Sequence, residues 1–206
     1  MKQSKEQIQN ELLQTQTSLQ YNGYTMTEVS FNFFVVNFLS FFIMLSYAFI
    51  FLLVWRFFNY SFLSAFKLNN RFQIIPLVVL LLILLLIHEL IHGICFACSN
   101  TQKWKSVHFG FYSSTFTPYC NCRECLSKKA YIISLLMPTI ILGFIPCIIA
   151  SFIGNNFLFL LGFCMIFGGS GDFLYFYSLL GIDSKNQELL ILDHPYKAGF
   201  IFFTKK

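Results

Sequence analysis

The segment that decides the fold is "LVVLLLILLLIHELIHGIC", Leu77 to Cys95. From Leu77 to Ile87 every residue is Leu, Val or Ile, and His88, Glu89 and His92 then follow without a turn-forming residue. Such an apolar run is typical of a helix that crosses a lipid bilayer. An ionisable side chain at the centre of a bilayer costs about 2.5 to 3.5 kcal/mol on insertion scales. The three ionisable groups therefore require a compensating cation, an opposite charge or water.

The composition places the whole chain in the same class. Of its 206 residues, 56% are hydrophobic and only 11% are charged, which is more apolar surface than a soluble domain of this size can bury. Four stretches reach the length of about 20 residues that a membrane-spanning helix needs: 33–58, 74–98, 131–153 and 157–180. We predict an all-α integral membrane protein, a four-helix transmembrane bundle with a short β-hairpin or irregular loop between the second and third spans.

The polar residues divide the chain into three segments. We predict a polar, partly helical N-terminal segment at 1–30, a transmembrane domain at 31–182 and a polar C-terminal tail at 183–206. The two terminal segments and the second loop together hold 11 Lys and Arg residues, against 3 on the other side of the predicted spans, so the positive-inside rule predicts a multi-pass protein of the cell membrane with both termini cytoplasmic. Because these basic residues flank the spans, we expect contacts with membrane lipids and none with nucleic acid.

The spacing of His88, Glu89 and His92 predicts a metal site. Two histidines four residues apart lie on one face of a helix, about 6 Å apart along its axis, where both imidazoles can bind one ion. Glu89 can then take a proton from metal-bound water without itself being a ligand, which is the chemistry of the HExxH pattern. The alternative is a structural cluster held by hydrogen bonds.

A catalytic zinc ion usually has three protein ligands, and the third is predicted to be Asp172. It is the acidic residue found inside the other predicted spans. The second and fourth spans run in the same direction. His88 is the fifteenth residue of the second span and Asp172 is the sixteenth of the fourth, so the two side chains lie at matching depth. The neighbouring glycines allow a close approach of helices or local unwinding. Glu124 is a weaker candidate because it lies in a basic loop.

Several motifs make the chain similar to a known family. The chain resembles the putative zincin peptidases, bacterial membrane proteins that look like compact relatives of the site-2 proteases. The resemblance covers the chain from about Thr27 onward. It rests on "HELIHG" (88–93), "YCNCRECLS" (119–127), "MP" (137–138), "GGSGD" (168–172) and "LDHPYKAGF" (192–200). In site-2 proteases the zinc ligands are the two histidines of HExxH and a later aspartate, which implies His88, His92 and Asp172 here. The Ser-Gly-Asp-Phe sequence around Asp172 departs from the usual Asn-Pro-Asp-Gly or Leu-Asp-Gly.

These features together predict a membrane-embedded zinc metallopeptidase. Zn²⁺ would lower the pKa of bound water, Glu89 would accept the proton, and the hydroxide would attack a peptide bond of a membrane-associated polypeptide. The alternative function is that of a non-catalytic membrane protein that binds a metal or holds a client protein.

The cysteines leave a second metal site open. Two groups with short spacing could supply four thiolates to a separate zinc ion, or they could be reduced packing and loop thiols: Cys95 and Cys98, then Cys120, Cys122 and Cys125.

Three further polar residues have predicted positions. His108 lies in a stretch with the alternation of a short strand or hairpin, and it is predicted to be a surface-exposed histidine. The alternative, implied by the resemblance to site-2 proteases, is that an extended substrate binds along this strand. Asp193 and His194 are predicted to lie in a solvated turn of the tail, without a role in the site.

Overall fold

The computed structural model describes residues 5–31, 33–58, 60–61, 64, 71–112, 117–183, 187–195 and 197–205. The longer helices are α1 (Lys5–Tyr21), α2 (Phe33–Phe57), α4 (Ile74–Ser99), α5 (Lys128–Thr139), α6 (Ile145–Ile153), α7 (Asn156–Gly168) and α8 (Ser170–Leu180). Three short helical segments are η1 (Arg71–Gln73), η2 (Lys103–Ser106) and the π-helical η3 (Ile140–Phe144). The strands are β1 (Thr25–Ser30), β2 (Val107–Tyr112), β3 (Thr117–Cys122), β4 (Leu126–Ser127), β5 (Glu188–Asp193) and β6 (Gly199–Lys205).

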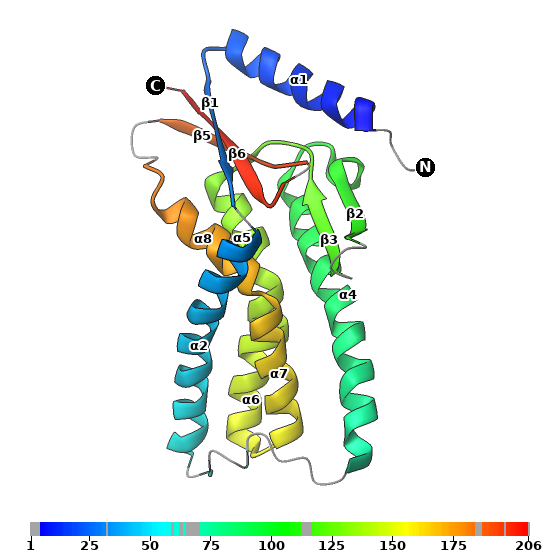
Figure 1. Cartoon of the computed structure of the whole chain (residues 1–206), viewed down its shortest axis with the longest axis vertical. Helices are drawn as coiled ribbons and strands as arrows, with labels where there is room; N and C mark the ends of the chain where they lie inside the picture. Colours follow the sequence, from blue (N-terminus) through cyan, green and yellow to red (C-terminus); the bar gives the residue numbers. More distant parts are fainter. Residues whose placement is uncertain are drawn as a thin grey trace.

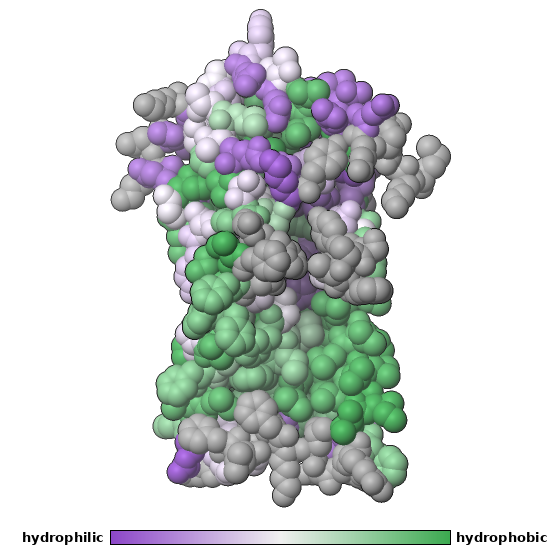
Figure 2. Space-filling model, viewed as in Figure 1, coloured by the Kyte–Doolittle hydropathy of each residue, from purple (hydrophilic) through white to green (hydrophobic). Residues whose placement is uncertain are grey.

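Apolar helices make up the long body of the molecule. Helix α2, helix α4 and the continuous run 128–153 are each long and apolar enough to cross a membrane. Helices α7 and α8 reach that length only as a pair, and they are bent by 50° relative to each other. The helices run along the long axis of the molecule, whose surface is hydrophobic around them and hydrophilic at the end that carries the sheet (Figures 1 and 2). Three of the four predicted spans thus correspond to helices that are long and apolar enough to cross a membrane, and the fourth corresponds to the bent pair.

A four-stranded antiparallel sheet covers one end of the helices, with α1 lying across it (Figure 1). Its strand order is β1-β6-β5-β4, so the sheet pairs a strand that precedes the first apolar helix with one that follows the last. Thr25 lies opposite Thr204, and Ser30 lies opposite Gly199. The prediction of an all-α chain is therefore wrong, and the segments predicted as separate polar ends join in one sheet.

The tail forms strands because of its apolar content. In β5 and β6 the buried side chains Leu192, Ile201 and Phe203 form a cluster against α1, which contributes Leu12 and Leu19. Alternate positions of these strands are therefore covered on the face that α1 occupies, which stabilises the pairing.

The predicted hairpin between the second and third spans is confirmed as β2 and β3. Val107 pairs with Cys122 at its base, and Tyr112 pairs with Thr117 near its tip. The hairpin packs along α4 at Gly93, where an added Cβ would overlap the ring of Phe109. The hairpin thus lies beside the helix that carries the HELIH residues.

Candidate metal centre

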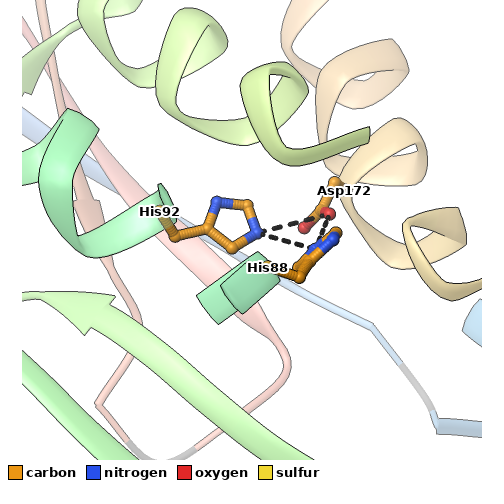
Figure 3. Close-up of side chains that lie close together, drawn as sticks. All are labelled: His88, His92 and Asp172. Atoms are coloured by element: carbon orange, nitrogen blue, oxygen red, sulfur yellow. Dashed lines mark hydrogen bonds and ion pairs between the residues drawn. The ribbon is translucent and has the colours of Figure 1, made fainter. Parts of the chain in front are cut away.

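Three side chains that are far apart in the sequence meet between α4 and α8 (Figure 3). Nε2 of His88 lies 3.2 Å from Nε2 of His92 and 3.2 Å from Oδ2 of Asp172, and Nε2 of His92 lies 3.4 Å from the same Oδ2. His88 and His92 are 3% and 5% exposed. Among the described residues, His88, His92 and Asp172 form the one group of His, Cys, Asp or Glu side chains whose ligand atoms are close enough together to bind one metal ion.

The hydrogen bond of His92 fixes which ring nitrogen faces the centre. Its Nδ1 lies 2.7 Å from the carbonyl oxygen of Ser134 in α5, and a carbonyl oxygen only accepts, so Nδ1–H is the donor. In the neutral ring Nε2 then carries the lone pair, and it points toward His88 and Asp172. A metal-binding histidine is typically oriented in this way by a backbone carbonyl. The Nδ1 atom of His88 is buried and has no hydrogen-bond partner in the described part of the chain.

The spacing of the three atoms fits zinc. Bonds of about 2.0 to 2.1 Å in a tetrahedral site place neighbouring ligand atoms about 3.3 Å apart. The observed separations of 3.2 to 3.4 Å match this edge length. Two imidazole nitrogens and one carboxylate oxygen are also ligands that zinc accepts, and three protein ligands leave one coordination position open. The residues present therefore fit a zinc ion.

A break between α7 and α8 places Asp172 in this group. Gly169 separates the two helices, and Asp172 lies in the first turn of α8, where the helix dipole favours a carboxylate. Gly169 also touches α5, since a Cβ at this position would overlap Oγ1 of Thr139 and approach the rest of its side chain. The absence of a side chain at Gly169 thus allows α8 to approach α5 beside the centre.

This contact predicts different effects for two adjacent glycines. We expect Gly169→Ala to lower the stability by about 1 to 3 kcal/mol, because the new methyl group overlaps the buried Thr139. Gly168→Ala is the control, since no atom of the described residues lies within 4 Å of a Cβ there. The measurement is thermal unfolding of the detergent-solubilised protein. Equal unfolding midpoints for the two variants would contradict the close contact.

Glu89 lies beside the three ligand candidates. Its electrostatic neighbours are His88, His92, Asp172 and the backbone of Cys120 in β3. The carboxylate is only partly buried, unlike the two histidine rings. Glu89 therefore lies between the candidate ligands and the hairpin, which is a suitable position for proton transfer.

Comparison with known proteins places the chain in a family. A family model described as "Putative zincin peptidase" matches residues 81–185. The chain belongs to this family. No curated protein and no solved structure matches the chain. Membership of a zincin peptidase family implies a metallopeptidase that uses zinc, and the matched region contains His88, Glu89, His92 and Asp172.

Asp193, outside the matched region, is part of a network that the sequence did not indicate. Its Oδ1 accepts a hydrogen bond from the hydroxyl of Tyr131, and its Oδ2 accepts one from the backbone N–H of Cys122 at 2.7 Å. Burial raises the pKa of Asp193 to about 6, although both hydrogen bonds act in the opposite direction. The prediction of a solvated turn is wrong here. Asp193 ends the apolar run "ELLILD", and that run is the signal for a buried strand.

His194 is not in a solvated turn either, since it is only 8% exposed. Its Nδ1 accepts a hydrogen bond from the backbone N–H of Lys197 at 3.0 Å, and its Nε2 lies 3.3 Å from Oε1 of Glu28 in β1. Lys197 binds the same carboxylate oxygen at 2.7 Å. His194 therefore connects β5 to the N-terminal strand.

The other candidates do not join the centre. The carboxylate of Glu124 accepts hydrogen bonds from the backbone N–H groups of Thr101 and Gln102 at 3.1 and 3.0 Å, and these interactions lower its pKa despite burial. Glu124 thus stabilises the loop between α4 and η2. His108 lies on β2, opposite Asn121.

The cysteines form no metal group in the described parts of the chain, and all seven are free thiols. Burial raises the pKa of Cys120 and Cys122, and it raises the pKa of Cys125 to about 12. Cys122 is buried in an apolar core cluster, and Cys120 packs against the same cluster. The structure therefore favours packing thiols over a second zinc site.

Proposed function

We propose that this protein is a membrane-embedded zinc metallopeptidase that hydrolyses peptide bonds of membrane-associated polypeptides. The observation that carries the proposal is the triangle of His88, His92 and Asp172, whose ligand atoms are 3.2 to 3.4 Å apart, with Glu89 beside it. The family match and the apolar helices around the centre support it.

Each residue has a distinct role in the proposed reaction. His88, His92 and Asp172 hold the metal ion, and the carbonyl of Ser134 keeps Nε2 of His92 pointing toward it. When bound, zinc supplies a Lewis acid that polarises the peptide carbonyl and lowers the pKa of a water molecule to about 7. Glu89 accepts one proton of that water on its carboxylate as the oxygen adds to the carbonyl carbon. It then returns the proton to the amine that leaves when the C–N bond breaks.

The surroundings of the centre define the proposed substrate. His88 and Asp172 both lie within the helices that make up the apolar body of the molecule. A polypeptide that reaches them must itself be compatible with a membrane. Its scissile carbonyl must also be free of helical hydrogen bonds, because a carbonyl inside a helix is already paired and covered. The proposed substrate is therefore a membrane-associated segment in a locally unwound conformation.

Metal analysis and metal removal test this function. We expect one zinc per chain by elemental analysis of the purified protein. We further expect cleavage of internally quenched apolar peptides in detergent micelles to stop on treatment with 1,10-phenanthroline and to return with added Zn²⁺. His194→Ala is the control, because this histidine contacts Glu28 and Lys197 and lies outside the group. A protein that binds no zinc, or cleavage that resists the chelator, would exclude the proposal.

A further inference from the structure

We propose that Asp193 is a positioning residue for the metal centre. In this proposal, which rests on the proposed peptidase function, its carboxylate holds α5 in place for His92 and β3 in place for Glu89. Asp193 makes no described hydrogen bond or ion pair with the ligand candidates or with Glu89, although its charge interacts with those of His92 and Asp172 through space. Its effect is transmitted through the two groups that it binds, Tyr131 and the backbone of Cys122.

The first connection runs through α5. Tyr131 lies near the start of this helix, is fully buried, and donates its hydroxyl hydrogen bond to Asp193. Ser134 lies one helical turn further along and presents its carbonyl oxygen to Nδ1 of His92 at 2.7 Å. Phe96 makes a parallel contact, because its ring centroid lies 6.2 Å from that of His92 and 6.2 Å from that of Tyr131. The position of Tyr131 therefore affects the carbonyl that orients His92.

The second connection runs through β3. Asp193 accepts the hydrogen bond of the Cys122 N–H at 2.7 Å, at the end of the strand. Two residues earlier, the backbone of Cys120 is a neighbour of the Glu89 carboxylate. Residues two apart on a strand face the same side, so the restraint at Cys122 acts directly on the part of β3 that faces Glu89.

The chemistry of Asp193 suits this role. A partly buried carboxylate that accepts two hydrogen bonds forms short, strong contacts that fix the relative positions of its partners. An alanine would leave a buried hydroxyl and a buried N–H without their acceptor. An asparagine can keep both contacts, since its amide oxygen can accept from Cys122 and its amide nitrogen can donate to the oxygen of Tyr131.

The neighbouring residue provides a matched control. His194 is buried and directly follows Asp193 at the end of β5, but its contacts go to Glu28 in β1 and to the backbone of Lys197. Replacing His194 therefore perturbs the same strand end without breaking either connection to the centre.

The experiment compares Asp193→Ala, Asp193→Asn, Tyr131→Phe and His194→Ala in the full-length protein in detergent. For Asp193→Ala we expect zinc affinity, measured by competition with a chelator, to fall about 10-fold, as for partners of metal ligands. At saturating Zn²⁺ we expect kcat to fall about 10- to 100-fold with KM within about 2-fold, because the geometry is displaced but the substrate still binds. Amide hydrogen exchange in 117–122 should become at least about 10-fold faster.

The other variants decide between positioning and general destabilisation. We expect Asp193→Asn to restore kcat and zinc affinity to within about 3-fold of the wild-type values, and Tyr131→Phe to give intermediate losses. His194→Ala should leave both unchanged. Wild-type values for Asp193→Ala, or equal losses in His194→Ala, would overturn the inference. If Asp193→Ala does not fold, wild-type values in Tyr131→Phe would overturn it.

These outcomes also separate the inference from the function on which it rests. Loss of zinc affinity in Asp193→Ala together with a wild-type protein that cleaves no peptide would overturn the peptidase and support the positioning of the metal centre. A wild-type protein that cleaves, with Asp193→Ala equal to it, would overturn the positioning role alone.

Discussion

Glu89→Gln is expected to lower kcat for peptide cleavage by about 10² to 10⁴-fold, the usual contribution of a general base. Glutamine has nearly the same size but accepts no proton, so the water can no longer be deprotonated at this position. Glu89 supplies none of the three ligand atoms of the triangle, so the zinc content should remain at one ion per chain. The measurement combines kcat on the quenched peptides with elemental analysis of the same preparation.

Glu124→Gln is the matched control for this substitution. Its carboxylate binds the loop at Thr101 and Gln102, so the same chemical change should leave cleavage within about 2-fold of the wild-type rate. Cleavage at the wild-type rate in Glu89→Gln would exclude the proposed mechanism. A protein that binds zinc but cleaves nothing in either form would instead correspond to the non-catalytic alternative.

Asp172→Ala is expected to remove zinc and activity together. Asp172 supplies the one anionic atom of the triangle, so the variant leaves two neutral imidazoles for a dication. Losing a ligand should exceed the about 10- to 100-fold loss of metal affinity that follows removal of a supporting residue. Zinc affinity by chelator competition and kcat at the same total zinc are the measurements.

The control for Asp172→Ala is Asp183→Ala, at an exposed aspartate beyond the end of α8. It makes the same chemical change outside the apolar body, and zinc affinity should stay at the wild-type value. Retention of tight zinc binding by Asp172→Ala would show that Asp172 is not a ligand.

The meeting of His88 and Asp172 could be predicted because both lie in apolar helices. The rise per residue of a helix is fixed, so positions counted along two spans of the same direction give their relative depth. The glycines before Asp172 allowed two interpretations, close approach or local unwinding, and Gly169 shows both. It contacts Thr139 and lies at the 50° bend between α7 and α8.

The sheet and the role of Asp193 could not be predicted in the same way. Strands β1 and β6 come from segments far apart in the chain, and the sequence of neither segment indicates which distant segment it pairs with. The Lys, Asp and His residues around β5 made the tail look polar, while its buried side chains become evident only when α1 lies against them. The sequence does not indicate a partner for Asp193, because Tyr131 and Cys122 belong to other segments of the chain.

The pairing of β1 with β6 also determines the order in which the molecule can be completed during synthesis. The side chains of Thr25 and Thr204 form a hydrogen bond between the two strands, and these residues are 179 positions apart in the sequence. At about 5 to 20 residues per second, β1 leaves the ribosome about 10 to 35 s before its partner exists. Asp193 is made almost as late as β6. A nascent chain can thus carry both histidines and Asp172 before Asp193 and β6 have been made. The proposed peptidase activity should therefore become complete only after β6 has emerged.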